Sequence, residues 1–210
     1  DLAFLGVLRE QNRNKLFVIT GCDSGIGKSL TRILLDNNYT VAISFLEKNP
    51  FKDEKNLFAK KMDLRLEADI KKFAKWIIGL CRKGFELKAL VNNAAIAKGG
   101  PIENLPLKIF REVFEVNFFG LISLTQKLIP QLINDEGSLF IVGSMAGLIS
   151  MPFLSPYSSS KFAIEGFTDS LRRELSPFGI NVVLFEPGGF STPIWKRSKK
   201  QDISFVDKKY

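Results

Sequence analysis

Short apolar segments alternate with longer amphipathic segments from residue 15 to about residue 187, and this alternation constrains the fold more than any other feature. Several of the short segments are apolar at nearly every position, as expected of strands that are buried on both faces. The longer segments repeat apolar residues every three or four positions, which is typical of helices that pack on a sheet. The pattern therefore predicts β–α–β units and a parallel sheet.

The predicted elements form an α/β, doubly wound, Rossmann-type fold with six parallel strands and helices on both faces. The predicted strands are Leu16–Thr20, Thr40–Phe45, Leu57–Met62, Ala89–Asn92, Ser138–Gly143 and Asn181–Phe185. The predicted helices are Ile26–Asn37, Glu67–Arg82, Leu107–Ile133 and Pro156–Ser176. The third is long, and we expect it to bend near Gly120. With no repeat or linker to divide the chain, residues 1–210 are interpreted as one domain with an N-terminal extension over 1–14.

Composition excludes several kinds of chemistry. The chain contains no histidine, which removes Ser-His-Asp and Cys-His catalysis and imidazole metal ligands. Its two cysteines, Cys22 and Cys81, are too few for a disulfide framework or a thiolate cluster, so we expect no metal site and a reducing, cytoplasmic setting. No apolar stretch reaches the roughly 18 residues that a membrane span needs, so we expect no integral membrane segment.

The formal net charge of +8 is concentrated at one end of the chain. The segment Trp195–Tyr210 holds six basic and two acidic residues. It lacks the interleaved aromatic residues on which single-stranded nucleic acids stack, so we interpret it as a solvated tail and expect no nucleic-acid partner.

A glycine-rich turn follows the first predicted strand and opens the first predicted helix. It reads Thr-Gly-Cys-Asp-Ser-Gly-Ile-Gly, and its candidate ligand-binding residues are Gly21, Ser24, Gly25, Ile26 and Gly27. Glycines let the backbone turn sharply and let a pyrophosphate approach the helix N-terminus, where free N–H groups favour negative charge. The turn therefore predicts a dinucleotide site.

Gly27-Lys28-Ser29 also resembles the end of a phosphate-loop ATPase motif. In that motif four residues separate the first glycine from the Gly-Lys-Ser, whereas here five residues separate Gly21 from Gly27. The apolar run that ends at Val142 continues into glycine and serine, with no acidic residue to hold Mg²⁺. The ATPase interpretation is therefore a minor alternative.

Ser144, Tyr157 and Lys161 form a second candidate group. Ser144 follows a predicted strand, at the same edge of the sheet as the glycine turn. Tyr157 and Lys161 are four residues apart on one face of a predicted helix. An adjacent ammonium favours the phenolate, so we expect the pKa of Tyr157 to be lowered toward neutrality. A serine hydroxyl can donate to a carbonyl oxygen on which negative charge develops. The group therefore predicts acid/base chemistry without histidine.

These motifs, in this order, resemble the short-chain dehydrogenase/reductase family from about Leu16 to Thr192. The matching residues are Thr20-Gly21-x-x-x-Gly25-x-Gly27, Asn92-Asn93-Ala94-Ala95, Asn117, Ser144, Tyr157-x-x-x-Lys161 and Pro187-Gly188-x-x-x-Thr192. The glycine turn and Leu171–Leu175 are most similar to retinol and hydroxysteroid dehydrogenases.

The resemblance implies a role for each matching residue. Tyr157 would be the acid/base, Lys161 would lower its pKa and hold the nicotinamide ribose, Ser144 would orient the substrate oxygen, and Asn117 would support a water in a proton relay. Besides the glycine turn, Tyr157 and Lys161, it implies cofactor contacts from Asp63 at the adenine, from Asn93, Ala94 and Ala95 on the adenosine side, and from Pro187, Gly188 and Thr192 at the nicotinamide. Leu64 is a further candidate cofactor contact.

The choice between NAD and NADP depends on the end of the second strand, where an acidic residue binds ribose hydroxyls or an arginine binds the extra phosphate. Ser44-Phe45-Leu46 offers neither. The lack of a clear cation favours NAD, and the nearby Lys48 leaves NADP open.

Length is the main departure from the family pattern. Family members usually continue beyond Thr192 through a substrate lid, a further helix and a seventh strand. We therefore expect the chain to be truncated or unusually short, with residues 189–210 as a partial lid.

We predict an oxidoreductase that transfers a hydride between NAD(P) and a secondary alcohol or ketone. The apolar residues Met145, Ile149, Met151, Phe153 and Leu154 favour a lipophilic small-molecule substrate. The alternative is a catalytically incomplete dinucleotide-binding protein with a regulatory or scaffold role. The resemblance also implies a homodimer or homotetramer.

Overall fold

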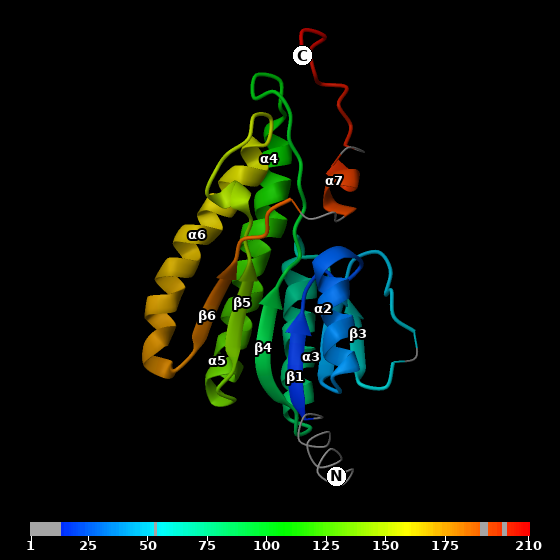
Figure 1. Ribbon diagram of the computed structural model, residues 1–210, viewed down its shortest axis with the longest axis vertical. Helices are drawn as coiled ribbons and strands as arrows, with labels where there is room; N and C mark the ends of the chain where they lie inside the picture. The colour runs from blue at the N-terminus through cyan, green and yellow to red at the C-terminus, as the bar shows by residue number, and fades with distance from the viewer. Residues whose placement is uncertain (1–13, 53, 190–192, 199–200) are drawn as a thin grey trace.

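The computed structural model describes residues 14–52, 54–189, 193–198 and 201–210, which build a single sheet with helices packed on it (Figure 1). The strands are β1 (Lys15–Ile19), β2 (Thr40–Phe45), β3 (Leu57–Lys61), β4 (Glu86–Asn92), β5 (Ser138–Val142) and β6 (Asn181–Phe185). Neighbouring strands are all parallel, in the order β3-β2-β1-β4-β5-β6. The predicted six-stranded Rossmann-type sheet is confirmed, and its order reverses between β1 and β4, where such sheets bind ligands.

Two hydrophobic clusters cover the two faces of the sheet. Helices α3 (Glu67–Cys81), α5 (Gly120–Asn134) and α6 (Ser155–Leu175) share the larger cluster with Leu16 and Val18 of β1. Helix α2 (Gly25–Asp36) packs on the opposite face, against Ile19 and its neighbours. The side chains of β1 thus alternate between the two clusters, as the period of a strand requires.

The long predicted helix is divided as expected, although the irregularity lies one turn earlier. Helix α4 (Leu107–Phe114) runs into a π-helical turn, η1 (Glu115–Phe119), and continues as α5 from Gly120. A Cβ at Gly120 would lie 2.5 Å from the carbonyl oxygen of Leu64, so this glycine lets the helix approach the loop after β3. The π-helical turn places Asn117 toward the protein interior, where it is 1% exposed.

The structure adds α7 (Pro193–Ser198), which the sequence pattern did not predict. This helix and the final ten residues lie beyond the carboxyl ends of the strands (Figure 1). No helix in the described ranges is long and apolar enough to cross a bilayer. Apart from Asn14, the predicted N-terminal extension lies outside the described residues.

Candidate active site

A cavity of about 310 Å³ opens at the carboxyl ends of the strands. It brings together most of the candidate residues: Gly21, Ser24, Gly25, Ile26, Asp63, Leu64, Asn93, Ala94, Ala95, Ser144, Tyr157, Lys161, Pro187 and Gly188. Gly27 and Asn117 are not in its lining, and both are buried. Thr192 is outside the described residues. The two candidate groups found in the sequence, the glycine turn and the Ser-Tyr-Lys group, therefore face one cavity.

The glycine turn is locked to the end of β4. The Thr20 hydroxyl accepts hydrogen bonds from the backbone N–H groups of Asn93 and Ala94, both at 3.0 Å. The Asn93 amide donates to the carbonyl oxygens of Thr20 at 2.8 Å and Gly21 at 3.1 Å. These bonds leave room only for glycine, because a Cβ at Gly21 would lie 2.7 Å from the Cα of Ala94. Gly21 also has a φ of +70°, which favours glycine.

The residues of this turn fit a bound anion. No side chain caps the N-terminus of α2, and its first turn contains no acidic residue. The first N–H groups of a helix have no partner within the helix, so those of α2 are available to a ligand at this edge of the cavity.

The Ser-Tyr-Lys group is largely buried. Tyr157 is 5% exposed and Lys161 is 2% exposed. The Lys161 ammonium donates to the carbonyl oxygen of Val142 at 2.8 Å and lies 5.8 Å from the centre of the Tyr157 ring. The Ser144 hydroxyl accepts a hydrogen bond from the backbone N–H of Ala146 at 3.1 Å, so its own proton remains available to donate.

The expected lowering of the Tyr157 pKa is wrong for this state of the protein. Burial raises the pKa of Tyr157, and the neighbouring Ser144 hydroxyl only partly opposes this rise. Burial also lowers the pKa of Lys161 to about 8, with Glu165 acting in the opposite direction. Both shifts have one cause, since a dry site disfavours the charged form of each group.

Asn117 reaches the loop after β4 from the π-helical turn. Its side-chain oxygen accepts from the N–H of Ile96 at 2.8 Å, and its amide donates to the Ile96 carbonyl oxygen at 2.9 Å. The amide also donates to the Ser160 hydroxyl at 3.0 Å, one residue before Lys161. Asn117 therefore fixes the loop that follows Ala95 to the helix that carries Tyr157.

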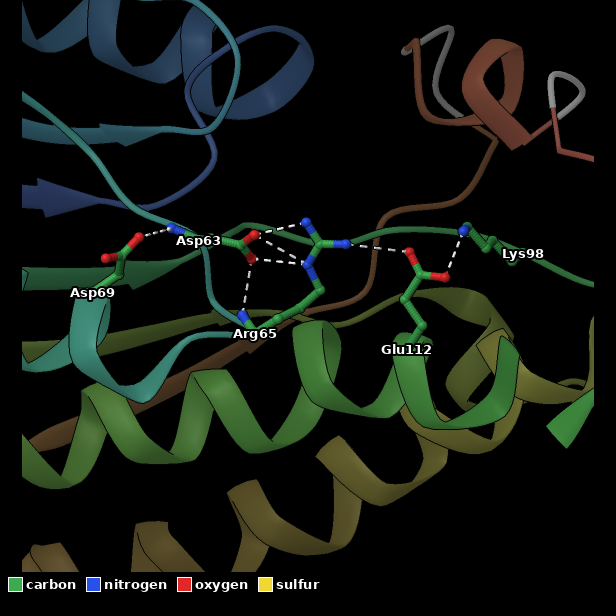
Figure 2. Close-up of polar contacts among 5 residues, drawn as sticks. All are labelled: Asp63, Arg65, Asp69, Lys98 and Glu112. Carbon is green, nitrogen blue, oxygen red and sulfur yellow. Dashed lines mark hydrogen bonds and ion pairs between the residues drawn. The ribbon is translucent and has the colours of Figure 1, made fainter. Parts of the chain in front are cut away.

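Asp63 belongs to a chain of charged residues along one wall of the cavity (Figure 2). Arg65 donates to both carboxylate oxygens of Asp63, with a shortest contact of 2.6 Å, and its far side lies 3.6 Å from Glu112. Glu112 in turn pairs with Lys98 at 2.6 Å. Hydrogen bonding from Arg65 keeps the pKa of Asp63 below its ordinary value, so this carboxylate stays ionised. Sequence analysis did not identify Arg65 or Glu112, since only the fold brings α4 to the end of β3.

Asp23 is a third residue that sequence analysis missed. Its carboxylate accepts hydrogen bonds from the backbone N–H groups of Leu46, Glu47 and Lys48, the shortest at 2.8 Å from Glu47. The glycine turn therefore carries a fixed carboxylate at the end of β2, where the sequence offered no acidic residue. Asp23 lines the cavity together with Leu46.

Comparison with known proteins identifies the family. The family model for short chain dehydrogenases matches residues 15–203. The chain belongs to the short-chain dehydrogenase family. It is therefore an NAD(P)-dependent oxidoreductase of the class that acts on CH–OH groups.

Among the relatives of this short-chain dehydrogenase is the uncharacterized oxidoreductase YusZ of Bacillus subtilis, 37% identical over 90% of this chain and 70% of that protein. The NADPH-dependent 3-dehydrocapnine reductase of Ornithobacterium rhinotracheale is also 37% identical, over 92% and 71%. Human retinol dehydrogenase 16 is 35% identical over 89% of this chain and 60% of its own length. The chain thus spans about two thirds of the length of these relatives.

Solved structures of the family share the fold. A short-chain dehydrogenase from Streptomyces avermitilis superposes with a TM-score of 0.78 at 30% identity, covering 86% of this chain and 67% of that one. The 3-ketoacyl-(acyl-carrier-protein) reductase from Brucella melitensis, solved with NADH, gives a TM-score of 0.78 at 26% identity, covering 89% and 80%.

The carboxyl groups of Glu165 and Glu186 form a pair close to Lys161 of this short-chain dehydrogenase. Glu165 follows Lys161 by one turn of α6, and a Cβ at Gly147 would lie 3.0 Å from one of its carboxylate oxygens. Burial, together with the neighbouring carboxyl groups of Glu186 and Asp169, raises the pKa of Glu165 to about 7, and Lys161 opposes this rise only in part. Near neutral pH this carboxyl is therefore partly protonated.

Glycine is required at Gly27 by packing. A Cβ there would lie 2.6 Å from the Asn93 amide nitrogen and 2.8 Å from the Gly21 carbonyl oxygen, so we expect Gly27→Ala to lower the free energy of unfolding by roughly 1–3 kcal/mol. Gly79 in α3 is the matched control, because nothing lies within 4 Å of its Cβ position. Gly79→Ala should raise stability by about 0.5–1 kcal/mol. Urea unfolding of both variants measures the difference, and equal effects would contradict this account of Gly27.

The raised pKa of Glu165 makes stability depend on pH. The folded protein holds this proton more tightly than the unfolded chain, so the stabilisation is complete below about pH 4.5 and is lost as the pH rises through about 7. Glu165→Gln should therefore be more stable than the parent at pH 8, by on the order of 1 kcal/mol because solvent screens part of the carboxyl, and nearly equal at pH 5. Urea unfolding at both pH values tests this. The exposed Glu174→Gln in the same helix should show no such difference between the two pH values.

Proposed function

We propose that this short-chain dehydrogenase interconverts a secondary alcohol and a ketone, with Tyr157 as the acid/base. The observation that carries the proposal is the meeting of Ser144, Tyr157 and Lys161 with the glycine turn in one cavity. The nicotinamide cofactor, when bound, supplies or accepts the hydride. The residues that would hold it are the glycine turn, Asp63 and Leu64, Asn93 to Ala95, and Pro187 and Gly188, together with Tyr157 and Lys161. We propose Thr192 for the same role from the family motif.

Each side chain of the Ser-Tyr-Lys group has a free hydrogen-bonding capacity that suits its role. Ser144 accepts from the Ala146 N–H and has one proton, which it can donate to the substrate oxygen. Tyr157 exchanges a proton with that oxygen. Lys161 gives one proton to the Val142 carbonyl oxygen and keeps two N–H groups for the Tyr157 oxygen and a ribose hydroxyl. Asn117 supports this arrangement from behind, through Ile96 and Ser160.

A preference for NAD over NADP is supported by the charges at the end of β2. Asp23 is held there by three backbone N–H groups, and Glu47 is the next residue but one after the strand. A ribose 2′-phosphate in this region would face the Asp23 carboxylate, whereas ribose hydroxyls could donate to it. The charge of Glu47 is partly offset by Arg197, at 3.9 Å. The Ornithobacterium relative is an NADPH-dependent reductase, so the proposed preference would distinguish this chain from that relative.

A lipophilic substrate is supported by apolar side chains beyond Ser144. Met145, Leu148, Ile149, Met151 and Phe153 are each at least 50% exposed. None of these five side chains lines the cavity that holds Ser144 and Tyr157, but the stretch begins directly after Ser144, and an apolar surface there suits a substrate with a hydrocarbon body and one oxygen function.

Residues 189–210 are proposed to act as a partial lid. Pro193, Ile194 and Trp195 of α7 line the cavity, and the Trp195 ring meets the Tyr157 ring edge-on at 5.7 Å. Gln201 holds the segment in place, since its side chain bonds both the N–H of Gly99 at 3.1 Å and the Gly99 carbonyl oxygen at 2.6 Å.

A homodimer or homotetramer is proposed from the family resemblance. It is supported by apolar side chains on two elements that pack together, η1 and α6. Phe119 is 52% exposed and Phe162 is 44% exposed. Self-association would remove such aromatic surface from water.

Tyr157→Phe is the direct test of the mechanism. Removing the hydroxyl removes the proton donor, so turnover should fall by about 10²–10⁴-fold while NADH binding is retained. Ketone reduction is followed by NADH absorbance with 2-octanone, cyclohexanone and acetoacetate, which also compares lipophilic with charged substrates. Tyr39→Phe, outside the cavity, is the control. Undiminished turnover in Tyr157→Phe would contradict the mechanism, and NADH binding without turnover of any ketone in the unmodified protein would favour the regulatory alternative.

Asp23→Asn tests the basis of cofactor preference. Asparagine can still accept backbone hydrogen bonds but carries no charge, so the ratio of NADPH to NADH affinity should rise about 10-fold. Calorimetric titration of both cofactors gives this ratio. Asp36→Asn makes the same charge change at an exposed position of α2 and should leave the ratio unchanged. If both variants behave alike, Asp23 does not determine the preference.

A further inference from the structure

Four cationic side chains line the cavity among the described residues, and three of them are already committed. Arg65 binds both carboxylate oxygens of Asp63, and Lys98 pairs with Glu112 at 2.6 Å. Lys161 is buried and bonded to the Val142 carbonyl oxygen. The fourth, Arg197, is on α7, and its one ion pair within the described residues is with Glu47, at 3.9 Å.

The contact between Arg197 and Glu47 is weak. Its length is close to the limit for an ion pair, and both side chains are largely exposed, 54% for Arg197 and 74% for Glu47. Exposed pairs of this kind contribute little to stability, because solvent screens the attraction and two flexible side chains must be held. A more highly charged anion in the cavity would therefore displace Glu47 from Arg197 readily.

Arg197 lines the same cavity as a helix N-terminus that suits an anion. Helix α7 lies beyond the N-terminal turn of α2 (Figure 1), and Arg197 lines the same cavity as Ser24 and Gly25. The first turn of α2 contains no acidic residue and has no side-chain cap. Its N–H groups would bind one side of a phosphate group, and a guanidinium fork on α7 would suit the opposite side.

We propose that Arg197 is a phosphate-binding residue of the cofactor site. When the dinucleotide binds, Arg197 exchanges its contact with Glu47 for a phosphate group, and α7 moves toward the cofactor. This inference rests on the proposed function. The diphosphate is the favoured partner, because the uncapped N-terminus of α2 in the same cavity suits a phosphate, whereas Asp23 holds a carboxylate at the end of β2. As a consequence, α7 contacts the cofactor through Arg197 and contacts Tyr157 through Trp195.

Calorimetric titration of Arg197→Gln with nucleotide fragments tests the proposal without relying on turnover. ADP carries a diphosphate, 2′-AMP carries only the 2′-phosphate, and adenosine carries neither. We expect the affinities for ADP and NADH to fall about 10-fold, and those for adenosine and 2′-AMP to stay the same. Arg197→Lys keeps the charge and should recover part of the loss. Lys196→Gln removes a charge from the adjacent, exposed position of α7 and should change none of these affinities.

The outcomes distinguish which phosphate group of the cofactor, if any, Arg197 binds. A loss confined to NADPH and 2′-AMP would keep Arg197 as a phosphate ligand but overturn its assignment to the diphosphate. Unchanged affinities for all ligands in Arg197→Gln would overturn the proposal while the proposed function stands. If the unmodified protein bound neither NADH nor NADPH, the proposed function itself would fail, and the inference with it.

Discussion

The junction between Thr20 and Asn93 is the contact on which the site depends. Two side chains at the ends of adjacent strands exchange hydrogen bonds with each other's backbone, so the glycine turn and the loop after β4 are held as one surface. The parallel sheet makes this possible, because it brings the carboxyl ends of β1 and β4 together at the point where the strand order reverses. This junction positions the N-terminus of α2 and Ala94 in the cavity lining. It also positions the start of the loop that Asn117 binds at Ile96.

Burial gives the site its chemical character. It excludes water from Tyr157 and Lys161, and thereby holds both groups toward their neutral forms. The same dry environment strengthens every remaining electrostatic interaction, including those with a bound ligand. The protein has no histidine, and its acid/base chemistry relies on groups whose ordinary pKa values lie far from neutrality. The protonation states of the Tyr157 phenol and the Lys161 ammonium therefore depend strongly on the charge that the cofactor brings into this enclosed space.

Local patterns predicted the sheet, because each strand and long helix carries its own periodicity. They also predicted two parts of the cavity lining, the glycine turn and the Ser-Tyr-Lys group, since glycine spacing and the four-residue step from Tyr157 to Lys161 are visible in the chain itself. The other predicted lining residues came from the family resemblance. Local patterns could not predict α7, which has only six residues and no repeat of apolar positions. Asp23 and Arg65 were missed for a different reason. The partners of Asp23 lie more than twenty positions away, and Arg65 meets Glu112 only after folding. The direction of the Tyr157 pKa shift was wrong because the depth of burial was not visible in the sequence.

The edge-on contact between Trp195 and Tyr157 has an optical consequence. The chain contains two tryptophans, and the other, Trp76, lies on α3 against Phe73, outside the cavity lining. Indole emission depends on the polarity around the ring, so a ligand that enters beside Tyr157 changes the surroundings of one fluorophore and leaves the second as an internal reference. The protein thus carries its own spectroscopic reporter, placed within contact of the proposed acid/base.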